Sequence, residues 1–286
     1  MLVTSKELFK IAREKHFAIP SANFIDVDSI RWYVEVAEKL KLPLILALAE
    51  AHMGPNITLE DAALVGRKYA EEASVPVVLH FDHGLDPVMI KKAIDLGFSS
   101  VMIDASMEDF DENVRRTKEI IEYAHARGVV VEAEIGHVGV GHNIGVSESA
   151  SSDDSSYTSV QSAIDFCKCT GVDSLAISIG TAHGLYKGTP KINFERLHEI
   201  AEAIDTPLVL HGGSSSGDEN LHRCATEGIS KVNIYTDFLV AAKKEIDEGK
   251  PDNYLALKKM AREGMQKCLA HYYEVFATQP VLKTEV

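Results

Sequence analysis

Short runs of apolar residues recur along the chain, and each is followed by a longer stretch in which apolar positions return every three or four residues. The short runs have the length and β-branched content of strands, and the longer stretches have the period of amphipathic helices. Runs such as PLILALA and PVVLHF lack polar alternation, which is typical of parallel strands covered on their outer face. The expected strands are Phe17–Asn23, Pro43–Ala49, Pro76–Phe81, Ser99–Asp104, Val129–Glu134, Ser174–Ile179, Pro207–His211 and Lys231–Tyr235.

Eight strand and helix units follow one another without a linker or a block of like charges. Eight such units in about 250 residues favour a closed (β/α)8 TIM barrel over an open doubly wound sheet. The open sheet predicts a Gly-x-Gly-x-x-Gly turn after an early strand, whereas Phe24, Ile25 and Asp26 follow the first strand here. We therefore expect an α/β fold in which residues 1–286 form a single TIM barrel, with an N-terminal closing helix and extra C-terminal helices at about residues 238–278.

Local signals mark where some elements begin. Helix starts are expected at Thr4-x-x-Glu7, at Asp86 before Pro87, at Thr158-x-x-Gln161 and at Ser216-x-x-Glu219. Residues Gly136–Tyr157 are rich in Gly, Ser and Asp, and they exceed the usual length of about two to six residues for a loop from a strand to a helix. Because they follow the carboxyl end of a strand, an active-site lid is favoured over a disordered insertion.

Composition limits the binding partners and the cellular compartment that we expect for this protein. The 43 acidic against 29 basic side chains leave a formal charge of −14, so the field of the protein opposes nucleic-acid binding. No apolar run approaches the roughly 18 residues that cross a bilayer, and Met1 to Lys15 resemble an amphipathic helix rather than an export signal. We expect a cytoplasmic protein with no membrane and no nucleic-acid partner, whose four cysteines are reduced thiols.

Polar side chains stand where the expected strands end, which is where TIM barrels carry their chemistry. His83 and His183 follow two of the expected strands, and His211 ends a third. Each precedes a glycine, while Glu134 ends another strand. Any one of these histidines alone is more often a hydrogen-bonded core residue. Together with a carboxylate they are the ligands that a zinc-like ion requires with room left for a substrate. The sequence therefore predicts a site for Zn²⁺ or another divalent ion.

Glycine and small residues surround the ends of the last three strands, at Gly180–Gly184, Gly212–Ser215 and Asn233–Thr236. Each segment alone is a common turn. Just before helices and beside the predicted metal ligands, such segments present backbone amides that bind phosphate at the seventh and eighth strands of a barrel. A small-molecule substrate that carries phosphate is therefore favoured.

Five segments form a pattern that is highly specific in combination: DHG at Asp82–Gly84, VEAEIG at Val131–Gly136, TGVDSLAISIGTAHGLYKGTPKINF at Thr170–Phe194, LVLHGGSS at Leu208–Ser215 and KVNIYTD at Lys231–Asp237. On these segments the chain resembles the class II metal-dependent ketose-bisphosphate aldolases. It is more similar to the tagatose-bisphosphate type than to the long fructose-bisphosphate type. The resemblance covers nearly the whole chain.

The resemblance implies a role for each matching position. His83, His183 and His211 match the zinc ligands of the family. Glu134 matches a carboxylate that approaches or ligates the ion, and Asp82 matches the catalytic acid/base. The resemblance also implies a nearby monovalent cation, Na⁺ or K⁺, and a homo-oligomer, either a dimer or a tetramer. Substrate-binding positions are matched by Asn23, Gly184, Lys187, Gly212, Gly213, Ser214, Asn233 and Thr236, with Asp104 and Ser106 in support at the rim.

Two regions depart from the pattern of the family. The lid reads Gly139-Val-Gly-His142-Asn143, where members usually carry Gly-Gly-x-Glu-Asp with an acidic residue that helps to move a substrate proton. His142 is our candidate for that second catalytic role, with acidic side chains further along the lid as alternatives. Tyr235 stands where fructose-type members have an acidic residue, and together with Glu50 and His52 it leaves the distal half of the substrate unidentified.

The function implied is that of a class II aldolase, a lyase that reversibly cleaves a ketose 1,6-bisphosphate or ketose 1-phosphate into dihydroxyacetone phosphate and an aldehyde. Asp82 would remove the proton of the C4 hydroxyl, and the ion would stabilise the resulting enediolate. A metal-dependent sugar-phosphate epimerase and a non-catalytic partner subunit are the alternatives. A Schiff-base lysine is disfavoured, because Lys231 is expected to begin its strand and Lys187 lies in a loop.

Overall fold

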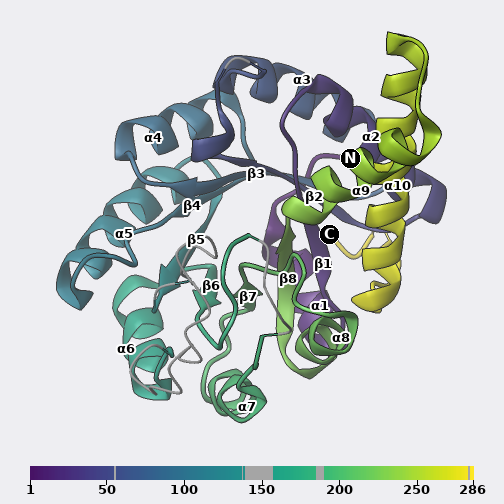
Figure 1. The fold of residues 1–286 in the computed structure, drawn as a ribbon. Coiled ribbons are helices and arrows are strands. Elements are labelled where there is room, and N and C mark those ends of the chain that lie inside the picture. The colour runs from purple at the N-terminus through teal and green to yellow at the C-terminus, as the bar shows by residue number, and fades with distance from the viewer. Residues whose placement is uncertain (55, 137, 139–156, 185–189, 283) are drawn as a thin grey trace.

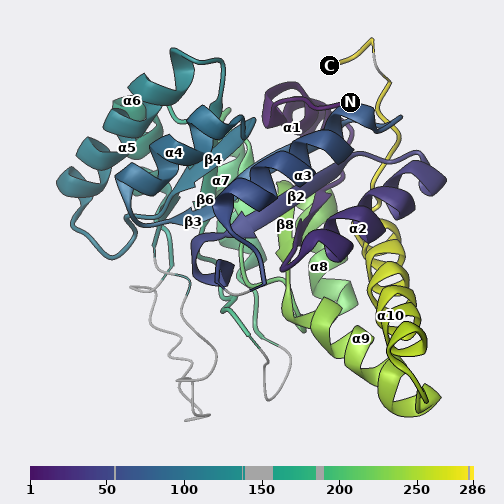
Figure 2. The ribbon, with the colours of Figure 1, turned by 90° about the horizontal axis from the view of Figure 1, so that it is seen from above.

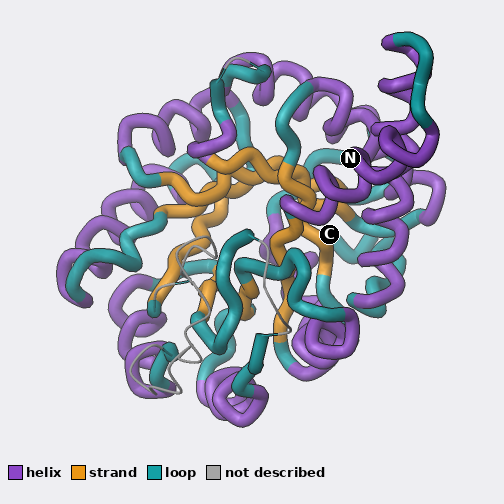
Figure 3. Tube along the Cα trace, viewed as in Figure 1, coloured by secondary structure: helices purple, strands orange, loops and turns teal. Residues whose placement is uncertain are grey.

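The computed structural model describes residues 1–54, 56–136, 138, 157–184, 190–282 and 284–286. Eight parallel strands form a closed barrel in which each strand pairs with the next along the chain and β8 pairs with β1. The predicted α/β barrel is confirmed (Figure 1), and Figure 3 shows the ring of strands inside the ring of helices. The strands are β1 (Ile19–Asn23), β2 (Leu44–Ala49), β3 (Val77–Gly84), β4 (Ser100–Ile103), β5 (Val130–Ile135), β6 (Ser174–Ile177), β7 (Leu208–Leu210) and β8 (Ile229–Ile234).

The helices that join successive strands cover the outside of the barrel. They are α2 (Val27–Leu40), α3 (Leu59–Glu72), α4 (Pro87–Leu96), α5 (Phe110–His125), α6 (Val160–Thr170), α7 (Phe194–Ala203) and α8 (Asp218–Glu227), with a short 3-10 turn η1 (Glu50–His52) before α3. Two C-terminal helices follow β8 as predicted, α9 (Thr236–Gly249) and α10 (Tyr254–Val275), and α10 packs against α9 and α2 (Figure 1). No helix in the described part of the chain is long and apolar enough to span a membrane.

The interior of the barrel changes from apolar to polar along the strands. Residues such as Ile45, Val78 and Val209 point inward at the N-terminal end, where they pack against Leu8 and Phe9 of α1 (Ser5–Glu14). This helix closes that end of the barrel, as predicted, and Figure 2 shows it at the opposite end from α9. Because strand side chains alternate between two faces, the next inward positions along β3 after Val78 are His80 and Asp82. An apolar floor therefore lies beneath a polar mouth.

Among the strand boundaries that differ from those predicted, two affect the site. β3 continues to Gly84, so Asp82 and His83 lie within the strand and not after it. β8 begins at Ile229, which already pairs with Leu208 of β7, so Lys231 is the third residue of the strand. The prediction that Lys231 begins its strand was wrong, and its side chain is buried inside the barrel with 1% exposure.

One predicted helix cap is confirmed and one is wrong. The Asp86 side chain accepts a hydrogen bond from the Val88 amide at 2.9 Å, and Pro87 occupies the first turn of α4. This arrangement satisfies one of the amides left free at a helix start. Thr4 does precede α1, but its side chain makes no capping hydrogen bond, so the capping box predicted with Glu7 is not formed.

The other two predicted caps are wrong because their hydroxyls are used elsewhere. The Thr158 hydroxyl bonds to the backbone at the ends of β5 and β6, at 2.7 and 2.9 Å, and Ser159 caps α6 in its place. The Ser216 hydroxyl donates to the Gly212 carbonyl at 2.9 Å, while Gly217 directly precedes α8. In both cases a bond that ties the rim of the barrel together replaces the local cap.

Candidate metal centre and active site

The end of β3 brings two consecutive side chains to the mouth of the barrel. His83 has a φ of 47°, in the left-handed region that non-glycine residues rarely adopt, and the pairing with β4 shifts register between Phe81 and Gly84. This irregularity lets both Asp82 and His83 reach groups of the barrel mouth, although neighbours in a regular strand face opposite sides. A Cβ at Gly84 would lie 2.6 Å from the Met102 carbonyl oxygen, so glycine is required there.

The structure brings His83, His183 and His211 together. Their ring centroids lie 4.8 Å apart for His83 and His183, 4.4 Å for His83 and His211, and 5.9 Å for His183 and His211. One ligand nitrogen from each ring lies within 4.8 Å of the other two. His83 lies in β3, and His183 and His211 follow β6 and β7, so residues distant in sequence meet as the sequence predicted.

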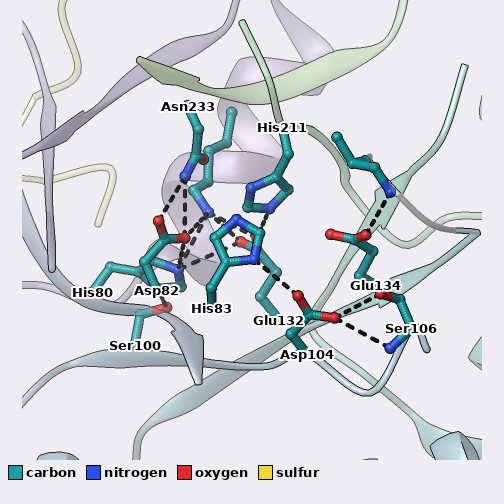
Figure 4. A network of polar contacts seen from close by, with 12 residues as sticks. His80, Asp82, His83, Ser100, Asp104, Ser106, Glu132, Glu134, His211 and Asn233 are labelled. Atoms are coloured by element: carbon teal, nitrogen blue, oxygen red, sulfur yellow. Dashed lines mark hydrogen bonds and ion pairs between the residues drawn. The ribbon is translucent and has the colours of Figure 1, made fainter. Parts of the chain in front are cut away.

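Each of the three rings keeps a nitrogen that is available to an ion. His83 Nδ1 donates to Asp104 at 3.0 Å, which leaves Nε2, and His211 Nε2 donates to Glu132 at 2.9 Å, which leaves Nδ1 (Figure 4). His211 Nδ1 and His183 Nε2 are buried and have no hydrogen-bond partner among the described residues. Buried polar atoms without a partner are costly, and ligation of a metal ion would satisfy them. The donor set therefore fits a zinc-like ion.

Glu134 lies beside this group. Its Oε1 accepts from the Val138 amide at 3.1 Å, and its Oε2 is buried without a partner in the described part of the chain. Carboxylate atoms of Glu134 and Asp104 lie within 4.8 Å of a His83 nitrogen, so a second possible ligand group shares His83 with the three-histidine group. Asp104 also accepts from Ser106 at 2.7 Å, which holds the carboxylate that orients His83 (Figure 4).

Asp82 is buried and firmly held. Its carboxylate accepts from Asn23 Nδ2 at 2.8 Å. It also accepts from Asn233 Nδ2 at 3.0 and 3.1 Å (Figure 4). Burial alone would raise the pKa of this carboxyl, but the positive charges of His83 and Lys231 and the neighbouring His80 ring hold the pKa well below its usual range. Asp82 is therefore an ionised base at neutral pH.

The pKa values of the candidate ligands are pushed apart by their surroundings. Burial lowers the pKa of His183 to about 3 and that of His211 to about 4, so both are neutral at pH 7. Burial also opposes a charge on His83, but Asp82 and Asp104 outweigh it and raise the pKa of His83 to about 9. Burial, together with the neighbouring Asp104, raises the pKa of Glu134 to about 8.

A network of buried charges lies below this site, and sequence reasoning missed it. Lys231 Nζ donates to both oxygens of Glu132, at 2.8 and 2.7 Å, and to His80 Nε2 at 3.2 Å. The polar residues at inward-facing positions of β3, β5 and β8 could have indicated this network, because the inward-facing residues at the N-terminal end of the barrel are apolar. The Lys231 ammonium is engaged by Glu132, which does not suit the free amine that Schiff-base chemistry requires.

The predicted phosphate segments lie at the ends of β6, β7 and β8. Gly212 has a φ of 67°, and a Cβ there would lie 2.5 Å from the Ala182 carbonyl oxygen, so this glycine allows two rim loops to touch. The Ser214 hydroxyl accepts from the amides of Tyr235 and Asp237, at 3.1 and 3.4 Å, so these two amides are already engaged. Of the other predicted positions, the structure places Gly184, Gly213, Asn233 and Thr236 at this same rim.

Two predicted site residues lie outside the described residues. These are His142, in the predicted lid, and Lys187, after the sixth strand. The sequence left another pair open, and the structure brings it together: the rings of His52 and Tyr235 stack with centroids 3.8 Å apart. Glu50 does not join that pair, because its carboxylate accepts from the Leu85 amide at 2.8 Å and so supports the turn after β3.

Fold and site together define a TIM-barrel protein with a candidate three-histidine metal centre beside a buried aspartate. Residues 3–280 match the family described as fructose-bisphosphate aldolase class-II. The protein YdjI of Escherichia coli K12 is 36% identical over 267 residues, which are 93% of this chain and 94% of that protein. The chain belongs to the class-II fructose-bisphosphate aldolase family, which confirms the resemblance found in the sequence.

Solved structures agree with this assignment. The crystal structure of the YdjI aldolase from Escherichia coli K12 matches with a TM-score of 0.87 and 32% identity, over 97% of this chain and 98% of that chain. The structure of fructose-bisphosphate aldolase from Campylobacter jejuni matches with a TM-score of 0.80 over 98% of this chain and 96% of that one. At 24% identity, the second likeness concerns the fold alone.

Proposed function

We propose that this protein is a metal-dependent aldolase that reversibly cleaves a ketose 1,6-bisphosphate or a ketose 1-phosphate into dihydroxyacetone phosphate and an aldehyde. One observation carries the proposal: available nitrogens of His83, His183 and His211 converge beside the ionised carboxylate of Asp82. Cleavage of a carbon–carbon bond of the ketose requires an acceptor for a hydroxyl proton. It also requires stabilisation of the negative charge that develops on the substrate. An ionised carboxylate next to candidate metal ligands supports both requirements.

The residues that would hold the ion are the three histidines, with Glu134 as a further carboxylate. A bound divalent ion supplies electrostatic stabilisation for the negative charge that develops on the substrate oxygens. Asp104 fixes the His83 ring through its hydrogen bond to Nδ1 at 3.0 Å, so that Nε2 faces the other ligands. Zn²⁺ suits three imidazoles best, and other divalent ions are compatible with the same donors.

Asp82 is the residue that would move the proton of the C4 hydroxyl, taking it in cleavage and returning it in condensation. Asn23 and Asn233 hold its carboxylate through three hydrogen bonds of 2.8 to 3.1 Å, so the base is oriented before the substrate arrives. Asn233 Oδ1 is buried without a partner among the described residues, and it is therefore available as an acceptor for a substrate hydroxyl. We assign the second catalytic role, at C3, to His142.

The substrate phosphate would bind where the ends of β6, β7 and β8 meet. We assign Gly184, Gly212 and Gly213 to this subsite. α9 begins at Thr236, with the positive end of its dipole at this rim. We assign Ser214 and Lys187 to the same subsite. A Na⁺ or K⁺ ion near these carbonyl-rich turns is part of the proposal.

Turnover on a panel of ketose 1-phosphates and 1,6-bisphosphates tests this function. Chelator-treated protein should release no triose phosphate, and Zn²⁺ or another divalent ion should restore the release. An epimerised sugar without triose phosphate would identify an epimerase. Tight metal binding without turnover of any substrate would favour a non-catalytic subunit. We also propose a cytoplasmic homo-oligomer, either a dimer or a tetramer, and light scattering measures that state.

A further inference from the structure

Lys231 lies in the middle of the barrel, one layer below the candidate metal centre. Its side chain is 1% exposed, and its ammonium contacts three groups: both oxygens of Glu132 at 2.7 and 2.8 Å, His80 Nε2 at 3.2 Å, and an Asp82 oxygen at 3.9 Å. Figure 4 shows its three contact partners, His80, Asp82 and Glu132, together with His211. A buried ammonium is rare unless it is paired, and here its pairing is complete.

The ammonium stands where three acidic or imidazole side chains converge. Ligand atoms of His80, Asp82 and Glu132 lie within 4.8 Å of one another, a grouping that by itself resembles a cation site. Lys231 contacts all three members of that grouping. The Lys231 ammonium therefore supplies the positive charge at this point, and it offsets the charges of two buried carboxylates.

Glu132 connects this cation to the metal centre. Oε1 of Glu132 accepts from Lys231 Nζ at 2.8 Å and from His211 Nε2 at 2.9 Å. Because Lys231 also holds Oε2, the carboxylate is fixed at both oxygens and presents Oε1 to the imidazole in one direction. His211 then turns its other nitrogen, Nδ1, toward His83 and His183.

We propose that Lys231 is a positioning residue for the metal centre: its ammonium fixes Glu132, and Glu132 fixes the ring of His211 so that Nδ1 faces the ion. The proposal rests on the proposed function only for the identity of the ion site. Groups that orient a metal-binding histidine commonly change metal affinity by about 10- to 100-fold when they are removed. Loss of Lys231 should therefore weaken metal binding although Lys231 does not touch the ion.

The experiment measures the affinity of the metal-free protein for Zn²⁺ by competition with a chromophoric chelator, without any substrate. Lys231→Met keeps the length of the side chain and removes the ammonium, and we expect affinity to fall by about 10- to 100-fold. Ser100→Ala is the matched control, because Ser100 is a buried neighbour of His80 that does not contact Glu132, and its affinity should equal that of the wild type. Circular dichroism and thermal unfolding establish that each variant is folded.

A double-mutant cycle separates positioning from packing. If Lys231 acts through Glu132, then Lys231→Met combined with Glu132→Gln should weaken Zn²⁺ binding no more than the stronger single change. Co²⁺ in place of Zn²⁺ reports the coordination geometry of the site through its visible absorption, and this spectrum should change in Lys231→Met.

Two results would overturn the inference. The first is that Lys231→Met folds, binds Zn²⁺ with wild-type affinity and gives an unchanged Co²⁺ spectrum. If Lys231→Met does not fold, Glu132→Gln is tested in its place. The second overturning result is then wild-type affinity for Zn²⁺ in Glu132→Gln. Because no substrate is used, a failure to detect aldolase turnover affects the proposed function and leaves this inference standing.

Discussion

Raising the pH from about 6 to about 8 should tighten metal binding, because His83 must lose a proton before it can ligate an ion. In the metal-free protein, burial opposes a charge on His83, but the neighbouring carboxylates raise its pKa to about 9. His183 and His211, with pKa values of about 3 and 4, are already neutral across this range. The proton that leaves at neutral pH therefore comes from His83 and not from the other two rings.

The expected size of the pH effect on metal affinity follows from these pKa values. At pH 7, a group with a pKa of about 9 is deprotonated in roughly one molecule in 100, which lowers the apparent metal affinity by about 100-fold, or about 3 kcal/mol. Affinity should rise about tenfold per pH unit and level off above about pH 9. Glu134, with a pKa of about 8, adds a second released proton if it also ligates the ion.

Calorimetric titration of the metal-free protein with Zn²⁺, repeated in buffers of different ionisation enthalpy at pH 7, counts the protons released. We expect between about one and two per ion. Glu134→Gln separates the two sources, since it removes the second proton and leaves the one from His83. A release close to zero, with affinity unchanged between about pH 6 and 8, would refute the assignment of His83 as a protonated ligand.

Other predictions concern the candidate base Asp82, the backbone at Gly84 and the stacked rings of His52 and Tyr235. Asp82→Asn should retain bound metal while losing turnover by about 10²- to 10⁴-fold, and unchanged turnover would remove Asp82 from the mechanism. Gly84→Ala should destabilise the protein by about 1 to 3 kcal/mol in urea unfolding, because its Cβ meets the Met102 carbonyl; equal stability would contradict this. His52→Ala, which removes the stack on Tyr235, should raise KM for the aldehyde by about 2- to 10-fold with KM for dihydroxyacetone phosphate unchanged; a change in the latter instead would place the stack elsewhere.

Local patterns were enough to predict the barrel and the rim on which the polar residues meet. A strand buried against helices needs apolar residues over a few positions, and a helix needs them every three to four, so both can be read within a short window. Carboxyl ends of parallel strands share one edge. For that reason, the His–Gly pairs at His83, His183 and His211 could be assigned to one place without knowledge of distances.

Contacts between distant segments were decided only by the tertiary structure. Lys231 and Glu132 are 99 residues apart, and their pairing depends on the register around a closed barrel, which no local window contains. The same holds for Thr158, whose hydroxyl ties two strand ends together although its neighbours in sequence suggest a helix cap. A histidine has two ring nitrogens, and the sequence does not say which of them is used. Which one remains for an ion is set by the carboxylate that the fold places against the other.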